Sequence, residues 1–382
     1  MVASRAVRLV LVTQDFPPAR GGIQTWSLEI ARHAAARCEA FAVIAPRAAG
    51  TAEIDAALGF RVLRTGSPNT LIAACAPLLR RLVNEGFEHS LHANWSTAPA
   101  ALALRGAGGL KSVAIMLAGR ELLLKPWQAL PPAQAGYDLV RRATLARADR
   151  LLPISEFTAG LARELGAPGE RMRITPCGTD PERFTPRDAT ALRERLALGG
   201  RPVLLSITRL VKRKGLDSVL AALPQVREAV PEVAYVVVGD GPDGERLRAR
   251  ANELGVADRV HFVGAKPDDE LPLWYALADV FVLPSRSEPP DVEGFGIVFL
   301  EAAAAERPVV AARAGGVPDA VADGVNGLLV APDDTRELAN ALVALLRDPE
   351  RRAVFGRRGR ERVIRDFTWA KVAERALAAI AT

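Results

Sequence analysis

The segment from residue 291 to residue 301 carries the clearest chemical pattern in the chain, because two carboxylates bracket a glycine loop and an apolar stretch. Gly294 and Gly296 permit a backbone that approaches a ligand closely, and the helix expected after them offers free N–H groups to an anion. Glu293 precedes that helix and Glu301 lies about two turns into it, so the two acids face different parts of one site. This combination suits a ligand with both hydroxyl and phosphate groups, such as a sugar nucleotide.

A basic segment upstream supplies partners for the phosphate groups. Residues 206–217 place Arg209 and Lys214 in a loop between an expected strand and an expected helix. Arginine can bind a phosphate through two parallel hydrogen bonds and lysine adds a compact charge, so together they would offset the charge of a diphosphate leaving group. Taken alone, such a loop is more often solvated surface. Its significance comes from the acidic segment downstream.

The elements that must position these residues form two sets of alternating strands and helices, which predict α/β domains with parallel sheets and helices on both faces. The expected strands cover residues 8–13, 41–45, 89–94, 112–117 and 150–154 in the first set, and 203–207, 234–238, 260–263, 280–283, 309–312 and 327–330 in the second. The expected helices include residues 26–37, 71–84, 137–148, 216–230, 246–254 and 368–381.

The length of the chain favours two domains, because 382 residues exceed the size at which a single core usually stops growing. A stretch rich in proline and polar residues, 175–186, separates the two sets and is typical of an interdomain linker. We expect two doubly wound, Rossmann-like domains, residues 1–180 and 181–367, with a cleft between them at the carboxyl ends of their strands.

Composition excludes several classes of protein. Hydrophobic residues make up 49% and charged residues 25% of the chain, an ordinary globular balance without an apolar run long enough to cross a bilayer. The apolar stretch at the start of the chain is too short for a secretory signal. The three cysteines are not spaced as metal ligands are. We therefore expect a cytoplasmic protein with free thiols.

Positive charge is concentrated in the first half of the chain. Residues 1–180 hold 21 Lys and Arg against 14 Asp and Glu, whereas the remainder holds 29 against 30. An excess of this kind favours an anionic membrane surface, an acidic substrate or nucleic acid. An ordinary solubilising use of arginine is equally compatible with it. Nucleic acid is the weakest of these readings, because the excess is diffuse and aromatic residues are only 5% of the chain.

Together these segments resemble the retaining glycosyltransferases of glycosyltransferase family four, which have the two-domain GT-B architecture. The resemblance covers nearly the whole chain, and it is strongest to bacterial phosphatidylinositol-mannoside mannosyltransferases that use GDP-mannose. The segments that carry it are residues 15–24, 209–215, 291–301 with its two acids, and 314–319. In this fold the last helix, here within residues 368–382, returns to the first domain.

The resemblance implies roles for the site residues. Arg209 and Lys214 would hold the donor diphosphate, Glu301 the ribose hydroxyls and Glu293 the hydroxyls of the donor sugar. The remaining donor-binding positions are the N-terminal loop glycines Gly21 and Gly22, the helix start at Gly296, Ile297 and Val298, and the nucleobase strand end from Val263 to Lys266.

One position departs from the family pattern. Most relatives carry His-Gly after the strand that corresponds to residues 112–117, with the histidine reaching the donor sugar, whereas Ala118 stands there in this chain. Alanine cannot supply that hydrogen bond, so another group substitutes for it, the enzyme is slow, or the chain is a variant of a histidine-bearing parent. His92 lies at another strand end, and site contact and a plain structural role are equally open for it.

The resemblance also implies the reaction. The acceptor would attack from the face that the diphosphate leaves, so catalysis rests on stabilising that diphosphate and positioning the acceptor. The sequence contains no Asp-x-Asp triplet of the metal-binding kind, and we expect neither a metal nor a cofactor. A UDP-sugar donor and a nonenzymatic sugar-nucleotide-binding protein remain alternatives. A dehydrogenase is weaker, because Gly21-Gly22 lacks the full Gly-x-Gly-x-x-Gly spacing.

The acceptor of these enzymes binds mainly to the first domain, which is the basic half of this chain. We expect a lipid, lipid-linked or glycan acceptor, with contact to an anionic membrane as a hypothesis. Residues 71–83 combine bulky apolar side chains with Arg80 and Arg81, as an interfacial helix does. A helix packed on the sheet needs the same apolar stripe and is the more common case.

Overall fold

The computed structural model describes residues 7–19, 21–67, 70–125 and 131–381. The chain forms two compact units: the N-terminal unit, residues 1–177 with 369–382, and the C-terminal unit, residues 178–368. Each unit is built on its own six-stranded sheet, and every strand pair in both sheets is parallel. The prediction of two doubly wound Rossmann-like α/β units is confirmed.

The sheet of the N-terminal unit has the order β3-β2-β1-β4-β5-β6. Its strands are β1 (Arg8–Val12), β2 (Ala40–Pro46), β3 (Arg61–Thr65), β4 (His89–His92), β5 (Ser112–Leu117) and β6 (Arg150–Pro153). Its helices are α1 (Gly22–Ala35), α2 (Thr51–Ala57), α3 (Leu71–Asn84), α4 (Ala98–Gly106), α5 (Arg120–Leu123), α6 (Pro131–Arg147), α7 (Glu156–Glu164) and α16 (Trp369–Ala381). The central strands are almost wholly buried, as a sheet covered on both faces requires.

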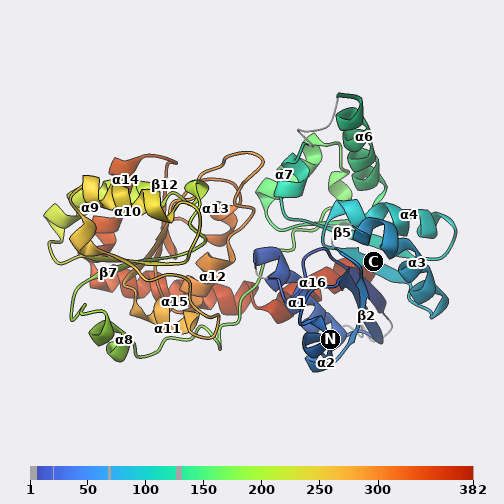
Figure 1. Cartoon of the computed structure of the whole chain (residues 1–382), viewed down its shortest axis with the longest axis horizontal. Helices are drawn as coiled ribbons and strands as arrows, with labels where there is room; N and C mark the ends of the chain where they lie inside the picture. The colour runs from blue at the N-terminus through green and yellow to red at the C-terminus, as the bar shows by residue number, and fades with distance from the viewer. Residues whose placement is uncertain (1–6, 20, 68–69, 126–130, 382) are drawn as a thin grey trace. The chain divides into compact units, whose positions relative to one another are not determined.

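The last helix belongs to the N-terminal unit, although it is the end of the chain. Figure 1 shows α16 beside α1, and the two helices are in contact. Arg150 Nε donates to the carbonyl oxygen of Ala379 at 3.0 Å, and Ser112 Oγ donates to that of Ile380 at 3.2 Å. Its buried apolar stripe, which includes Trp369 and Leu377, therefore packs as part of this unit's core.

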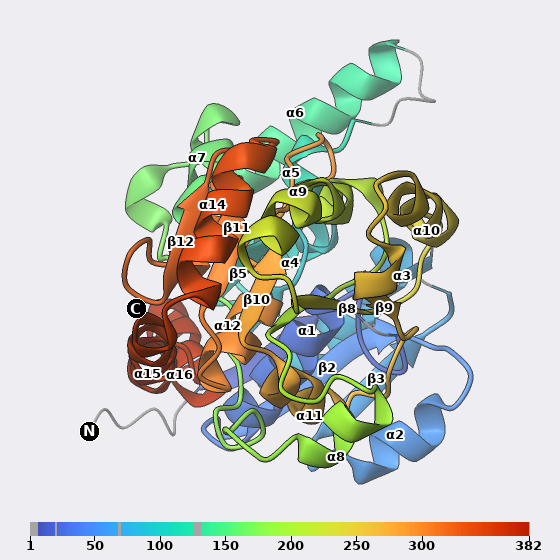
Figure 2. The ribbon, with the colours of Figure 1, turned by 90° about the vertical axis from the view of Figure 1, so that its left-hand side faces the viewer.

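The sheet of the C-terminal unit has the order β12-β11-β10-β7-β8-β9. Its strands are β7 (Val203–Ile207), β8 (Ala234–Val238), β9 (Val260–Phe262), β10 (Val280–Leu283), β11 (Val309–Ala312) and β12 (Gly327–Val330). Its helices are α8 (Thr190–Arg195), α9 (Leu216–Ala229), α10 (Gly244–Glu253), α11 (Leu271–Leu277), α12 (Ile297–Ala304), α13 (Val317–Ala320), α14 (Thr335–Leu346) and α15 (Pro349–Asp366). Figure 2 shows α9 and α14 side by side over this sheet.

Two differences from the sequence pattern have physical causes. Strand β3 was not expected, because Arg61 and Arg64 interrupt its apolar pattern and only Leu63 and Thr65 are buried at this edge of the sheet. Helix α1 begins at Gly22 and α6 at Pro131, each several residues before the apolar periodicity becomes clear.

Cys75 and Cys177 are buried free thiols, whereas Cys38 is only half-buried.

Candidate functional site

The turn after β7 brings a lysine onto one of the two predicted acids. A single 3₁₀ turn, Lys212–Lys214, ends at Gly215 before α9 begins. Lys214 Nζ donates to Glu293 Oε2 at 2.5 Å, and Arg213 Nη1 lies 3.5 Å from the same oxygen. The side chains of Lys214 and Glu293 are only 12% and 13% exposed, so this ion pair is largely shielded from water.

Burial and charge act in opposite directions on Glu293. Burial alone would raise the pKa of its carboxyl group, but the charges and hydrogen bonds of Lys214 and Arg213 outweigh it and hold the pKa below the ordinary 4.5. The carboxyl group is therefore ionised at neutral pH. It accepts hydrogen bonds, as a group that binds sugar hydroxyls must.

Glycines allow three loops at the carboxyl ends of neighbouring strands to pack backbone against backbone. Gly215 has φ +69°, and a Cβ there would lie 2.1 Å from the carbonyl oxygen of Pro284. Gly315 has φ +55°, and a Cβ there would lie 2.3 Å from the carbonyl oxygen of Glu293. The N–H of Gly316 donates to that oxygen at 2.8 Å. These contacts fix Glu293 between the turn after β7 and the turn after β11.

Helix α12 starts beside Glu293, as predicted. Gly296 precedes it with φ +95°, and a Cβ there would collide with the ring of Phe299 at 2.4 Å. The first N–H groups of a helix have no acceptor within it, so those of Ile297 and Val298 are suited to bind an anion. Both residues are half-buried.

Glu301 has a partner that the sequence did not indicate. Its Oε2 accepts a hydrogen bond from the hydroxyl of Tyr275 in α11 at 2.7 Å. Burial raises the pKa of Glu301 despite this bond, and burial together with the nearby carboxylate raises the pKa of Tyr275 well above its ordinary value. The two acids thus have different surroundings: Glu293 is paired with cations, and Glu301 with a neutral phenol.

Arg209 and the predicted nucleobase segment follow β7 and β9, two strands of the same sheet that are separated by β8. Arg209 is exposed, and its guanidinium group has no partner among the residues that the structure describes. After β9, the N–H of Ala265 donates to Asp240 at 2.8 Å, and Lys266 Nζ lies 5.3 Å from the centre of the Trp274 ring. Val263 is half-buried and its N–H donates to the carbonyl oxygen of Val237 at 3.0 Å.

The N-terminal unit holds the remaining predicted positions at the carboxyl ends of β1 and β5. Gly22 is the first residue of α1, and Gly21 before it has φ +153°. Ala118 follows β5, and its N–H donates to Glu121 Oε1 at 2.7 Å. Glu121 is 5% exposed, and burial raises the pKa of its carboxyl group. This carboxyl group, which the sequence reasoning missed, fixes the loop that begins at Ala118.

His92 has a structural role. Its side chain is fully buried, with Nδ1 2.9 Å from the hydroxyl of Thr97 and Nε2 3.2 Å from that of Ser90. Burial lowers its pKa to about 3, so the ring is neutral at physiological pH. It therefore does not replace the histidine expected at position 118.

Within the described ranges, 7–19, 21–67, 70–125 and 131–381, no helix is long and apolar enough to cross a membrane. Within the same ranges no three His, Cys, Asp or Glu residues are grouped in a way that would hold a metal ion.

Two Rossmann-like units, each built on a parallel sheet, and a largely buried lysine–glutamate pair before a glycine-led helix are features expected of a transferase that uses a sugar nucleotide. Comparison with known proteins agrees. Residues 20–183 match the model described as Glycosyltransferase Family 4, and residues 188–362 match that described as Glycosyl transferases group 1. The chain belongs to the family-four glycosyltransferases, and it is a glycosyltransferase with the GT-B fold.

Named relatives match almost from end to end. The chain is 38% identical over 375 residues to the GDP-mannose-dependent alpha-(1-6)-phosphatidylinositol monomannoside mannosyltransferase of Mycolicibacterium smegmatis, covering 94% of this chain and 95% of that protein. It is 32% identical to the GDP-mannose-dependent monoacylated alpha-(1-6)-phosphatidylinositol monomannoside mannosyltransferase of Corynebacterium glutamicum, covering 98% of this chain and 97% of that protein.

Solved structures share the fold. HepE of Anabaena, in complex with UDP, superimposes with a TM-score of 0.81 at 22% identity, covering 98% of this chain and 100% of that chain. Sucrose-phosphate synthase of Thermosynechococcus elongatus superimposes with a TM-score of 0.74 at 25% identity, covering 97% of each chain.

Proposed function

We propose that the protein transfers mannose from GDP-mannose to a hydroxyl group of a phosphatidylinositol-mannoside lipid, with retention of configuration and without a metal ion. The observation that carries the proposal is the end-to-end likeness, at 38% identity, to a mannosyltransferase with this donor and this class of acceptor. The geometry around Lys214 and Glu293 supports donor binding, because it places a cation and an ionised acid beside a helix start.

The donor would bind through groups of the two loops that follow the adjacent strands β7 and β10, and of helix α12. Arg209, which has no partner within the described part of the chain, and Lys214 would bind the diphosphate, together with the N–H groups at the start of α12. Glu293 would accept hydrogen bonds from the mannose hydroxyls, and Glu301 from the ribose.

The reaction would proceed by electrostatic stabilisation of the leaving group. As the bond between mannose and the diphosphate breaks, negative charge develops on the diphosphate, where Arg209 and Lys214 stabilise it. The acceptor hydroxyl would form the new bond on the same face, passing its proton to a departing phosphate oxygen. No carboxylate nucleophile is needed, so Glu293 serves to orient the sugar.

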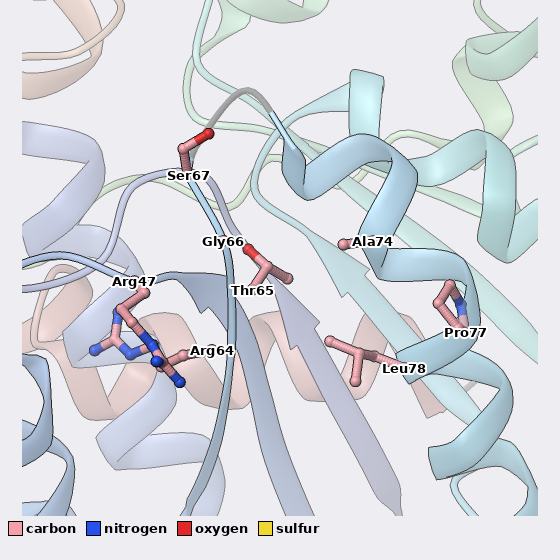
Figure 3. Close-up of a pocket in the computed structure, with 8 residues that line it drawn as sticks. All are labelled: Arg47, Arg64, Thr65, Gly66, Ser67, Ala74, Pro77 and Leu78. Carbon is pink, nitrogen blue, oxygen red and sulfur yellow. The ribbon is translucent and has the colours of Figure 1, made fainter.

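The acceptor would bind to the N-terminal unit. At the ends of β2 and β3 a cavity of about 680 Å³ is lined by Arg47, Arg64, Thr65, Gly66 and Ser67 on one side and by Ala74, Pro77 and Leu78 of α3 on the other (Figure 3). Asp55 neutralises Arg64 through a 2.7 Å ion pair, whereas the guanidinium group of Arg47 has no partner among the described residues. One cation facing an apolar wall suits the phosphate of a lipid and the start of its hydrocarbon.

Contact with an anionic membrane would accompany lipid binding. Helix α3 exposes 49% of Ile72 and carries the exposed residues Arg80 and Arg81, of which Arg81 pairs with Glu85 at 3.0 Å. One helix that carries both an exposed apolar side chain and exposed basic residues suits the surface of an anionic bilayer. Sedimentation with anionic and neutral vesicles tests this part, and equal partitioning at low salt would contradict it.

A thermal-shift panel of GDP, UDP and their sugars tests the donor assignment, because a ligand that binds only the folded state raises the melting temperature. We expect GDP and GDP-mannose to raise it more than their uridine counterparts, and a larger shift with UDP would contradict the assignment.

A second candidate is a protein that binds the sugar nucleotide without transferring the sugar, which Ala118 favours. Release of GDP from GDP-mannose excludes it.

A further inference from the structure

Arg286, three residues after the end of β10 at Leu283, joins the loop that carries Glu293 to the turn that carries Lys214. Its backbone N–H donates to the carbonyl oxygen of Arg213 at 2.7 Å. Its Nη1 donates to the carbonyl oxygen of Lys212 at 3.3 Å. Two successive carbonyl groups of the basic turn are thus held by one residue.

The same guanidinium group is itself fixed by side chains of other elements. Nη1 donates to Asp217 Oδ1 at 2.9 Å and Nη2 to the hydroxyl of Ser218 at 2.7 Å, both at the start of α9. Nε donates to Asp333, which lies after β12. The Arg286 side chain is only 20% exposed. A planar guanidinium group bound on all three nitrogens has one orientation, which a lysine could not reproduce.

Arg286 also neutralises Asp217, a carboxylate that would repel an anion bound at the turn. Asp217 follows the basic turn by three residues and is paired both with Arg286 and, at 3.3 Å, with Arg246. Without these partners its carboxylate would reduce the positive potential that the turn offers to a diphosphate. Arg246 differs from Arg286 in one useful respect, because it has no hydrogen bond to the basic turn in the part of the chain that the structure describes.

We propose that Arg286 is a positioning residue for the donor: it sets the backbone of the turn Lys212–Lys214 so that Lys214 faces the diphosphate beside Glu293. The inference rests on the proposed donor site and deepens it. Arg286 acts through the turn and does not itself contact the sugar or the phosphate.

The test compares Arg286→Ala, Arg286→Lys and the matched control Arg246→Ala with wild type and with Lys214→Ala. Calorimetric affinity for GDP and for UDP is measured first, with the melting temperature of each variant. Steady-state KM values for donor and for acceptor follow. We expect R286A and R286K to lose about tenfold in affinity for whichever nucleoside diphosphate binds wild type, with a matching rise in donor KM and an unchanged acceptor KM. R246A should change the nucleotide affinity by less than about twofold, because Arg246 makes no hydrogen bond to the basic turn within the described residues.

Each alternative outcome is decisive. If R286A keeps the nucleotide affinity of wild type while K214A loses nucleotide affinity, the positioning role of Arg286 is overturned and the proposed donor site still stands. If R246A loses as much nucleotide affinity as R286A, the neutralisation of Asp217 accounts for the effect, and the positioning role of Arg286 is again overturned. Wild type that binds neither nucleotide would overturn the donor site together with this inference. If R286A does not fold, Ser218→Ala removes one of the hydrogen bonds that orient the Arg286 guanidinium group. The affinity of S218A for GDP should then be about threefold lower than that of wild type.

Discussion

Lys214 Nζ and Glu293 Oε2 lie 2.5 Å apart, although the two residues are 79 positions apart in the chain. The pair connects the loops that follow β7 and β10, which are adjacent strands. The parallel topology thereby brings together a cation and an ionised acid, the groups that we propose for the donor phosphate and the sugar hydroxyls.

Glu293→Gln keeps the size of the side chain and removes its charge. We expect kcat/KM to fall about 10- to 100-fold, because charged hydrogen bonds to the sugar hydroxyls become neutral ones and Lys214 loses its partner. Steady-state kinetics with GDP-mannose measures this. Glu288→Gln, an exposed acid in the same loop, is the matched control and should leave the kinetics unchanged.

The Lys214–Glu293 pair should make stability depend on pH in one direction. The native pKa of Glu293 lies below 4.5, so its contribution to the free energy of unfolding is present above pH 4.5 and is lost as pH falls through the native value. Urea unfolding of wild type and Lys214→Met at pH 7 and at successively lower pH checks this. The difference between the two proteins should shrink on acidification, and a constant difference would contradict the charge pairing.

Glu301 should respond to acid before Glu293 does. Its pKa is raised above 4.5, so it takes up a proton at higher pH, and the carboxylate that would hold the ribose is lost. GDP affinity should therefore decline as pH is lowered toward 4.5, and Glu301→Gln should bind more weakly at pH 7 with a flatter profile. Titrations of both proteins across this range decide it, and parallel profiles would argue against a ribose role.

Most strands could be predicted from the sequence, because the pattern that marks a strand lies within the strand and its flanking turns. Strands β7, β8, β10, β11 and β12 match the expected ranges residue for residue, because each is a short buried run between turn residues. Strand β3 was missed because arginine alternates with its buried side chains.

The site was only partly predictable. The spacing of glycines and charges pointed to Lys214 and Glu293, which the fold brings into contact. Nothing in the local sequence indicates Tyr275 as the partner of Glu301, or Glu121 as the acceptor of the Ala118 N–H, since such pairs are set by tertiary packing. Arg286 was missed for the same reason: its partners lie in residues 212–218 and at Asp333, both far from it in the chain.

Ala118→His should raise turnover and leave donor affinity similar or tighter. A histidine there would offer the sugar a hydrogen bond that alanine cannot, worth about 1 kcal/mol or roughly fivefold in rate. The Glu121 carboxylate already holds the backbone of this loop, so the new side chain does not need to order it. Single-turnover kinetics measures the effect, with Ala118→Leu as a control for size that cannot form a hydrogen bond, and a slower A118H enzyme would contradict the expectation.

An assay of the transfer reaction is the most direct test of the proposed activity. Wild type and Lys214→Ala would be incubated with GDP-mannose and vesicles that contain a phosphatidylinositol monomannoside, and the lipids analysed by mass spectrometry. We predict a product heavier by one hexose with wild type and its loss in K214A. GDP-mannose left intact by wild type, or hexose transferred only from a UDP-sugar, would contradict the proposed mannosyl transfer from GDP-mannose.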